Sequence, residues 1–416
     1  MMYQFVELNE TEYDNFERQQ INGTFVQSAR QAELLKSRGY DVWLLGVKDK
    51  HQIVAAALVL REKIHMGYVF SIDHGPLLNF DQPILVKFFI NGIIKFARQH
   101  QGLFIELRPN ITYLETDNHG NLLRPSHDAA ISMFESLGFS HQPFTLGMST
   151  DGSPEWEYVK DLSDIHDDSA LRDSYDKKVN YYLKKNAQFG VTLRYLKRAD
   201  LIEFKTLTET TAKRLAYHDK DLDFYQKAYD IYGDEVTYVV AELDFAAYLA
   251  EERQHVELLS QKITKIEDKM VKYPDNPKFK RQQAEYISQK EAHDKRIATA
   301  SDQWQAAGQD QVIVAGAMFI EQPQEITYLY SGTYETYMEY YGPYQIQDAM
   351  LRHAISKGIK RFNFYGIAGR FDGSDGVLKF KTVFNGHARQ LIGKFILPVH
   401  PFKYRIYRTL KHMLRR

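Results

Sequence analysis

Residues 340–366 read YYGPYQIQDAMLRHAISKGIKRFNFYG, and this stretch decides the fold. After the Gly342–Pro343 step, apolar residues recur at helical spacing through residues 345–358. Residues 361–366, RFNFYG, predict a strand, and so does EITYLYSG at 325–332 earlier in the chain. Together these segments predict a strand, a Gly-Pro loop, a helix and a second strand.

The same order of elements occurs earlier. Residues 67–72 predict a strand, Gly75–Pro76 a loop, 84–100 an amphipathic helix and 103–109 another strand. The match extends over about 70 residues, which makes it a pseudo-repeat. The flanking elements also correspond: short helices at 133–139 and 378–384, a last strand at 389–397, and pairs of strands at 41–47 with 53–60 and at 236–243 with 311–320.

Six or seven mixed strands with helices on both faces describe an acyltransferase-like unit of the N-acetyltransferase (GNAT) type. We therefore expect an α/β fold with mixed sheets, built from two such domains in tandem. The first domain is predicted to span residues 1–148. The second is predicted to combine residues 149–242 with residues 307–396.

A charge-rich, nearly glycine-free segment separates the two parts of the second domain, at residues 243–306. Its first half carries an apolar seam at alternating spacings of three and four residues, which indicates a coiled coil. The sequence KYPDNPKF then stops the helix, because two prolines within four residues cannot continue it. We expect an inserted antiparallel helical arm. The seam consists of Val256, Leu259, Ile263, Ile266 and Met270, followed by Tyr286, Ile297, Ala300 and Trp304 in the second half.

Composition excludes several classes of protein. The 416 residues have a net charge of −1 and are 44% hydrophobic, which fits a globular chain without a global basic field. The absence of cysteine excludes disulfides, zinc–thiolate sites and a cysteine nucleophile, and it suits a reducing cytoplasm. The N-terminal segment does not resemble a signal peptide, and the longest apolar run, IVAAALVL, is too short to span a membrane.

The tail at 397–416 is basic, with six Lys/Arg and no acid in HPFKYRIYRTLKHMLRR. Ile406, Leu410, Met413 and Leu414 form one apolar stripe. Such an end favours contact with an anionic membrane surface or RNA. A helix that simply packs on the fold is an equally good interpretation.

The segment DGVLKFKTVF at 375–384 predicts a short helix with Val377, Phe380, Val383 and Phe384 facing inward. Lys379 and Lys381 lie beside Phe380. Lysines in such positions are usually solvated.

Several of these segments together resemble the Fem ligases, which use aminoacyl-tRNA to branch peptidoglycan. The resemblance rests on YYGPYQIQDAMLRHAISKGIKRFNFYGIAGRFD with GVLKFKTVFNGHARQLIGKF, and on FVQSARQAELLKSRGYD at 25–41. It covers essentially the whole chain, the arm included. It implies that a stem-peptide amine, on lipid II or on UDP-MurNAc-pentapeptide, attacks the ester of aminoacyl-tRNA. The transferred residue would be Ala, Ser or Gly, and the co-substrate tRNA would take the place of any cofactor.

The resemblance also implies roles for individual residues. Aminolysis of an ester passes through an oxyanion, which a pre-positioned cation stabilises. Lys381, held by Phe380, matches the family lysine assigned to that intermediate, whereas Lys379 is expected to be solvated. Many relatives carry an acid where this chain has Arg108. Arg108 is therefore expected either to contact a carboxylate or phosphate of the precursor or to form a structural pair at the surface.

Other positions match the family's substrate contacts. Lys36 and Lys220 are expected to hold the pyrophosphate of the acceptor, and Phe224 and Tyr330 are expected to lie near the substrate. For tRNA, the candidate is the stretch 176–198, which contains seven Lys/Arg and one Asp. The lysines proposed for this contact are Lys177, Lys178, Lys184 and Lys185.

Two rival functions share these features. An acetyl-CoA-dependent acetyltransferase should open its main helix with a glycine-rich pyrophosphate loop, but the two copies read DHGPLLN and YYGPYQI. A non-catalytic RNA- or membrane-binding scaffold would not require the Phe380–Lys381 pair. The 15 histidines show no convincing ligand spacing, so we predict no metal site.

Overall fold

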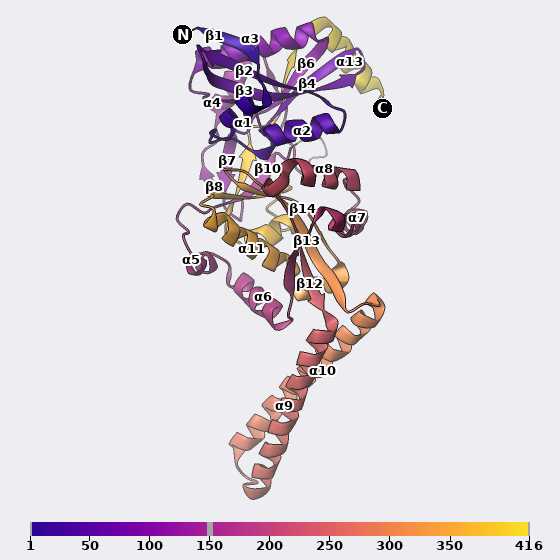
Figure 1. Cartoon of the computed structure of the whole chain (residues 1–416). Coiled ribbons are helices and arrows are strands. Elements are labelled where there is room, and N and C mark those ends of the chain that lie inside the picture. The colour runs from indigo at the N-terminus through magenta and orange to yellow at the C-terminus, as the bar shows by residue number, and fades with distance from the viewer. Residues whose placement is uncertain (1, 148–152, 415–416) are drawn as a thin grey trace.

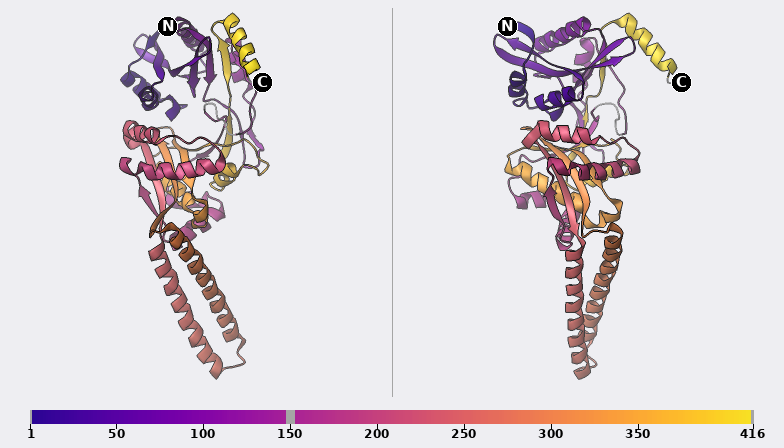
Figure 2. Two further views of the ribbon diagram at one scale, coloured as in Figure 1. Left: turned by 90° about the vertical axis from the view of Figure 1, so that its right-hand side faces the viewer. Right: turned by 45° about the vertical axis from the view of Figure 1, so that its right-hand side comes forward.

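The computed structural model describes residues 2–147 and 153–414 and contains two mixed sheets, stacked end to end in Figure 1. A long helical arm extends from the second sheet on the side away from the first (Figure 2). The expected α/β class with mixed sheets is confirmed.

The first sheet has the strand order β1-β2-β3-β4-β6-β17-β9, with β5 paired to β3. Its β4–β6 pair is parallel and the other pairs are antiparallel. The strands are β1 Tyr3–Glu7, β2 Asp41–Asp49, β3 Gln52–Ile64, β4 Gly67–Asp73, β5 Leu77–Leu78, β6 Gly102–Arg108, β9 Ser140–His141 and β17 Phe395–Pro398. Helix α3 (Pro83–Gln99) covers one face, and α1 (Glu10–Glu17) and α2 (Ala29–Ser37) cover the other; α4 (Asp128–Ser136) follows later in the chain.

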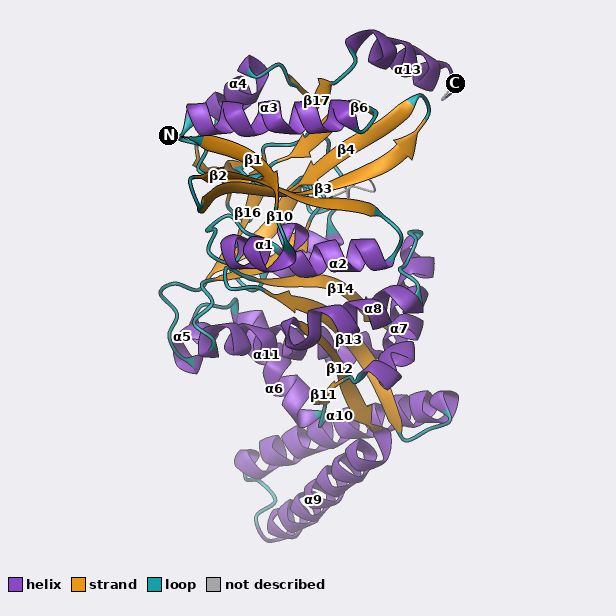
Figure 3. Ribbon diagram, turned by 45° about the horizontal axis from the view of Figure 1, so that its top comes forward, coloured by secondary structure: helices purple, strands orange, loops and turns teal. Residues whose placement is uncertain are grey.

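The second sheet has the order β11-β12-β13-β14-β15-β10-β16-β7-β8, with a parallel β14–β15 pair. Its strands are β7 Thr112–Thr116, β8 Leu122–Arg124, β10 Trp156–Asp161, β11 Thr192–Tyr195, β12 Val236–Asp244, β13 Gln311–Glu321, β14 Ile326–Thr333, β15 Arg361–Gly366 and β16 His387–Leu391. Its helices are α5 Asp168–Asp173, α6 Lys177–Gln188, α7 Leu201–Leu215, α8 Leu222–Tyr232, α11 Gly342–Ser356 and α12 Gly376–Thr382. Figure 3 shows α5, α6, α7, α8 and α11 beside these strands.

The two copies of the repeat correspond as expected. In each copy, the strand before the main helix pairs in parallel with the strand after it, and this is the one parallel pair of the sheet. These pairs are β4–β6 around α3 and β14–β15 around α11. The expected loop at Gly342–Pro343 is wrong, because both residues lie in the first turn of α11. Proline is well tolerated there, since its missing N–H would have no helical partner.

The two sheets exchange strands. β7 and β8 follow β6 in the chain but pair in the second sheet, whereas β17 follows β16 but pairs with β6 in the first. The expected single strand at 389–397 is therefore wrong. Gly393 has a φ of 81°, a left-handed conformation that breaks the strand and redirects the chain. The boundary placed at residue 148 lies outside the described residues, and the division into folding domains stays a prediction.

The expected arm is present as α9 (Phe245–Lys272) and α10 (Pro277–Ala307), which pack against each other. In the first half, Leu259 and Ile266 are buried and the other seam residues are half-buried, so the seam is confirmed. The turn between the helices coincides with the two prolines of KYPDNPKF. Pro277 begins the second helix, where proline is favoured.

Helix α13 (Pro401–Leu414) ends the described chain and lies on β6. Phe104 contacts Tyr404 and Tyr407, with ring centroids 5.1 and 5.9 Å apart. Phe402 and Met413 remain 75% and 57% exposed, while the side chain of Leu414 lies outside the described residues. Within residues 2–147 and 153–414, no helix is both long enough and apolar enough to cross a membrane.

Candidate active site

Helix α12 is fixed at its start by Asp375. One oxygen of this carboxylate accepts hydrogen bonds from the backbone N–H groups of Val377 and Leu378, at 2.9 and 3.0 Å. The other oxygen accepts one from the N–H of Ala368, at 2.8 Å. Asp375 thus caps the helix and ties it to the loop that follows β15.

Lys381 is 4% exposed, near the end of α12. Its Nζ donates hydrogen bonds to the carbonyl oxygens of Gly366, at 2.6 Å, and Tyr365, at 3.2 Å. Burial lowers the pKa of Lys381 to about 7, although the charges of Asp375 and Glu157 raise it in part. Near neutral pH, α12 therefore presents a buried amine that is partly protonated.

The buried face of α12 differs from the expected one. Phe384 is fully buried as expected, but Val377 is 39% exposed, so its inward placement is wrong. The helix begins only at residue 376, which leaves Val377 in the first turn beside the cap. Leu378 and Lys381 fill the buried face instead, and Lys379 is exposed as expected.

Aromatic rings connect α12 to α6. Phe380 contacts Tyr344 at 5.3 Å between ring centroids, and Tyr344 contacts Tyr182 of α6 at 4.6 Å. The backbone N–H of Asp176, which caps α6, donates to the carbonyl oxygen of Val383 at 2.9 Å. The start of α6 is therefore bound to the end of α12.

The basic residues expected to contact tRNA lie on this neighbouring helix. Lys177, Lys178 and Lys184 are exposed, and Lys185 is half-buried with its Nζ 5.8 Å from the centroid of the Tyr181 ring. The Tyr181 ring is itself 53% exposed. The structure therefore places cations and an accessible ring beside α12, which is the combination that binds unpaired RNA.

Sequence reasoning missed a second buried lysine. Lys160 of β10 is 3% exposed, and its Nζ donates to the carbonyl oxygens of Phe384, at 2.8 Å, and Asn385, at 3.2 Å. Burial lowers its pKa to about 8. Lys160 thus fixes the chain just beyond α12.

A buried ion pair lies next to these groups. Arg389 of β16 donates to the carboxylate of Glu157 at 2.8 and 2.5 Å, and the Glu157 side chain is fully buried. The negative charge of Glu157 opposes the lowering of the pKa of Lys381. Nothing in the sequence pattern pointed to either residue, because both occur in short strands that also carry other polar side chains.

A second group of predicted residues assembles around Phe224. The Nζ of Lys220 lies 5.6 Å from the centroid of the Phe224 ring, and Tyr330 lies 5.8 Å from it, centroid to centroid. Arg38, which was not predicted, lies over the same ring at 5.1 Å. Burial lowers the pKa of Lys220, and Arg38 lowers it further. Two cations held close together in this way suit an anion, and the nearest protein carboxylate, that of Asp221, lies 3.8 Å from Arg38.

Lys36 does not join this group. Its Nζ pairs with Glu10 at 3.0 Å, and the side chain is 42% exposed. Helix α2 ends at Ser37, so Arg38 occupies a non-helical cap position from which it reaches Phe224. The cation that the structure brings to Lys220 is therefore Arg38.

Tyr365 lies between the two groups. Its carbonyl accepts from Lys381, while its ring contacts Phe25 at 6.0 Å, beside the cluster that contains Phe224 and Tyr330. Its φ of 64° is strained for an aromatic residue. The Asn363 side chain accepts from its N–H at 2.8 Å and supports that conformation.

Arg108 is 13% exposed in its side chain and lies 2.9 Å from Asp73 and 2.6 Å from Glu106. A structural pair was one of the two expectations, but it was expected at the surface and the structure shows it largely buried. Contact with a precursor stays a prediction.

Among the described residues, one group has metal-ligating geometry. It consists of Glu252, His255 and His293, and it lies on the arm and not at α12.

Comparison with known proteins gives consistent results. The family model described as "FemAB family" matches residues 8–412. "Aminoacyltransferase FemA" of Staphylococcus aureus strain bovine RF122 / ET3-1 is 29% identical over 98% of both chains, and that of strain N315 is 28% identical over the same share. Among solved structures, "Crystal structure of FemX" aligns with a TM-score of 0.75 and 18% identity, over 97% of this chain and 99% of that one.

A second solved structure supports the doubled fold. A tandem GNAT protein from the clavulanic acid biosynthesis pathway aligns over 96% of this chain and 99% of that chain, with a TM-score of 0.50 and 8% identity. The tandem arrangement of acetyltransferase-like units expected from the repeat is thereby confirmed.

Proposed function

This chain belongs to the FemAB family, and from that premise we propose that it is an aminoacyltransferase of peptidoglycan bridge synthesis. It moves an amino acid, Ala, Ser or Gly, from aminoacyl-tRNA to the side-chain amine of the stem peptide. The acceptor is lipid II or UDP-MurNAc-pentapeptide. Aminoacyl-tRNA is the co-substrate, and the reaction requires no further cofactor.

The observation that carries the proposal is the buried amine of Lys381. An ammonium group has three N–H donors, and two of them bond the carbonyls of Tyr365 and Gly366. The third is available to the oxyanion that forms when the amine attacks the ester. Because Lys381 is buried, this interaction occurs in a medium of low dielectric constant, where it is stronger than in water.

Lys381 is enclosed by protein, so the ester can reach it only if the neighbouring loop opens. The loop at 367–375 is the segment tied to α12 by Asp375, and residues 372–374 are exposed. Movement of such loops on substrate binding is a common gating step. Closure of the loop over the bound substrate would also exclude water.

The two substrates approach from different sides of Lys381. Helix α6 offers cations and the exposed Tyr181 ring to the tRNA acceptor end, and the contacts through Tyr182 and Tyr344 lead to Phe380. Lys220 and Arg38 offer two cations to the pyrophosphate of the acceptor. Lys36 would join them only if its ion pair with Glu10 were broken.

We also assign the enzyme to the inner face of the plasma membrane, where lipid II is made available to it. Helix α13 supports this, because its basic sequence exposes Phe402, Leu410 and Met413. A basic helix with exposed apolar residues binds anionic lipid surfaces.

The test is a reconstituted reaction of purified protein with each acceptor and a panel of charged tRNAs, read by mass spectrometry of the product. Lys381→Met should lower turnover by about 100-fold or more while tRNA binding is retained. Lys379→Met, on the same helix but exposed, is the matched control and should remain active. Full activity of Lys381→Met would refute the catalytic role, and absence of product from every tRNA would refute the function.

A further inference from the structure

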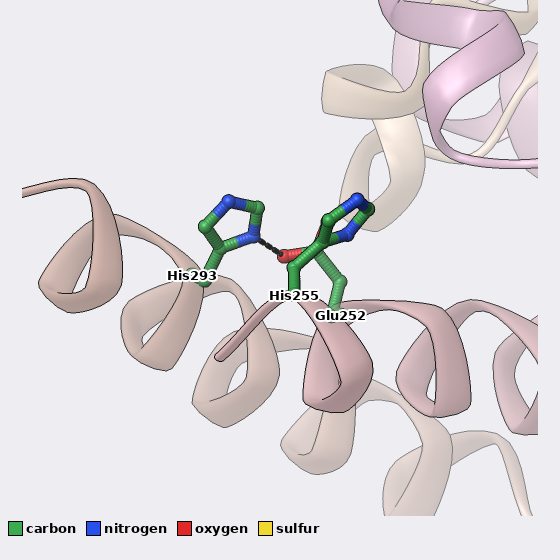
Figure 4. A group of neighbouring side chains, drawn as sticks. All are labelled: Glu252, His255 and His293. Carbon is green, nitrogen blue, oxygen red and sulfur yellow. Dashed lines mark hydrogen bonds and ion pairs between the residues drawn. The ribbon is translucent and has the colours of Figure 1, made fainter. Parts of the chain in front are cut away.

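A cluster of three metal-ligating side chains joins the two helices of the arm. Glu252 and His255 lie three residues apart on α9, and His293 faces them from α10 (Figure 4). These residues are here called the arm cluster. One potential ligand atom from each lies within 4.8 Å of the other two.

Glu252 is unusual for a residue on a protruding hairpin. Its side chain is 6% exposed, whereas the sequence around it is charged and largely exposed. The nearest seam residue, Val256, lies one turn further along α9. A carboxylate buried at such a position needs a cation or strong donors to offset its lost hydration.

Two neighbouring groups of the protein contribute to that compensation. Glu252 accepts from Nδ1 of His293 at 2.7 Å, and Arg296 approaches the same oxygen only to 3.7 Å. The ring of His255 lies parallel to that of His293, with 5.1 Å between centroids and 25° between planes. His255 therefore lies beside the carboxylate of Glu252 and the imidazole of His293, and no hydrogen bond from the described residues fixes its own ring there.

We propose that the arm cluster binds a divalent first-row transition metal ion such as Zn²⁺, and that this ion links α9 to α10. Two imidazoles and one carboxylate are ligands that Zn²⁺ accepts, with water completing a tetrahedron. Bond lengths of about 2.0–2.2 Å place tetrahedral ligand atoms roughly 3.4 Å apart. The most widely separated ligand atoms, which lie within 4.8 Å, must therefore approach by at most about 1.4 Å, whereas the Glu252–His293 pair at 2.7 Å must separate slightly. His255 is exposed and Arg296 is 37% exposed, so both can move as the metal replaces Arg296 beside Glu252.

Such a site would be structural. It lies on the half of the arm nearer the sheet, since α9 begins at Phe245 and does not end until Lys272. A metal there would hold the two helices together near their base. The proposal is independent of the transferase function, and it replaces the expectation from the sequence that the chain has no metal site.

The experiment uses the full chain after removal of metals with a chelator and dialysis. Calorimetric titration with ZnCl₂ should show one site per chain, and the melting temperature should rise with added zinc because the metal binds the folded state. Titration with Co²⁺ should give the visible absorption of tetrahedral coordination.

Variants at the arm cluster make the test specific. His255→Ala and His293→Ala should each weaken zinc binding at least about tenfold and abolish the cobalt spectrum. The matched control is His353→Ala, which removes a histidine paired with Glu321 at 2.6 Å but lacking a third ligand; its zinc affinity should be unchanged. Because His255 is exposed, His255→Ala should fold normally, as circular dichroism can verify. Absence of zinc binding, or equal binding by His255→Ala and wild type, would overturn the proposal.

Discussion

At the scale of residues, two lysines determine how α12 is held. Lys381 binds the carbonyls at the end of β15, and Lys160 binds those just beyond the helix. Both amines are buried, and burial lowers both pKa values. Two amines that are costly to bury therefore lie around one short helix. Amines with pKa values lowered in this way are found more often at functional sites than elsewhere in a protein.

The depressed pKa of Lys381 predicts a pH dependence of stability. Between pH 7 and pH 10 the unfolded chain holds a proton on this amine that the folded chain releases, so the free energy of unfolding rises with pH. The gain of wild type relative to Lys381→Met should approach about 1 kcal/mol per pH unit in that window. Urea unfolding at pH 7, 8 and 9 measures it. The contribution of Lys160 is present in both proteins and cancels. A constant difference across the window would show that folding does not lower the pKa of Lys381.

The Glu157–Arg389 pair predicts a large effect of breaking it. Arg389→Met leaves the Glu157 carboxylate buried without its cation and should lower the free energy of unfolding by about 3–5 kcal/mol. Arg124→Met is the matched control, because Arg124 pairs with Glu115 but is 74% exposed. Its cost should stay below about 1 kcal/mol. Denaturant titration compares the two, and equal losses would contradict the assigned burial.

The sequence indicated some of these residues and not others, for physical reasons. Lys381 was recognisable because it lies in a distinctive motif within a short helix. Lys160 stands in a strand whose sequence gives no sign that both faces are buried. Lys36 was chosen by its match to a family position, and that match gave no sign that Arg38, at the cap beyond the last turn of α2, reaches Phe224.

At the scale of elements, the arm is an insertion between two paired strands. Asp244 of β12 is paired with Gln311 of β13, and the N–H of Phe245 donates to the carbonyl of Asp310 at 2.9 Å. The base of the arm is part of the core, since Phe245 and Leu249 are fully buried. The outer part of the arm therefore adds little to the fold of the sheet.

Shortening the arm should separate folding from tRNA binding. Deleting residues 258–290 and closing the helices with a short turn keeps the buried base and should leave the melting temperature of the sheets nearly unchanged. If the arm also contacts tRNA, affinity for tRNA should fall several-fold in filter binding. Unchanged affinity would assign tRNA binding to α6 and the rest of the second sheet.

The elements themselves were largely predictable, but two of their relations were not. The repeat and the coiled-coil seam are periodic signals and were confirmed. The break at Gly393 was missed because an apolar run with one glycine resembles a continuous strand. The arm cluster was missed because only the register of the hairpin, in which His255 and His293 lie almost equally far from the turn, brings its residues together.

At the scale of the whole molecule, the exchanged strands join the two sheets. β17 connects the second sheet back to the first, and β7 does the reverse. Neither sheet is complete without residues from the other half of the chain. We therefore expect the two sheets to unfold together.

The three tryptophans make this measurable, because each lies in a different part: Trp43 in β2, Trp156 in β10 and Trp304 in α10. Variants that retain one tryptophan each should show the same denaturant midpoint for Trp43 and Trp156. Trp304, on the arm, should report a transition at equal or lower denaturant concentration. Distinct midpoints for Trp43 and Trp156 would mean that the sheets are independent in spite of the exchange.

The position of β17 also bears on how the protein is synthesised. Most strands of the first sheet are translated before those of the second, yet the β6 edge of the first sheet gains a partner only when residues 395–398 have been translated. Folding from the N-terminus onward, the usual course during translation, cannot complete this sheet. A nascent chain must therefore keep that edge unpaired through most of its synthesis, and chaperones that cover exposed strands would act on it during that interval.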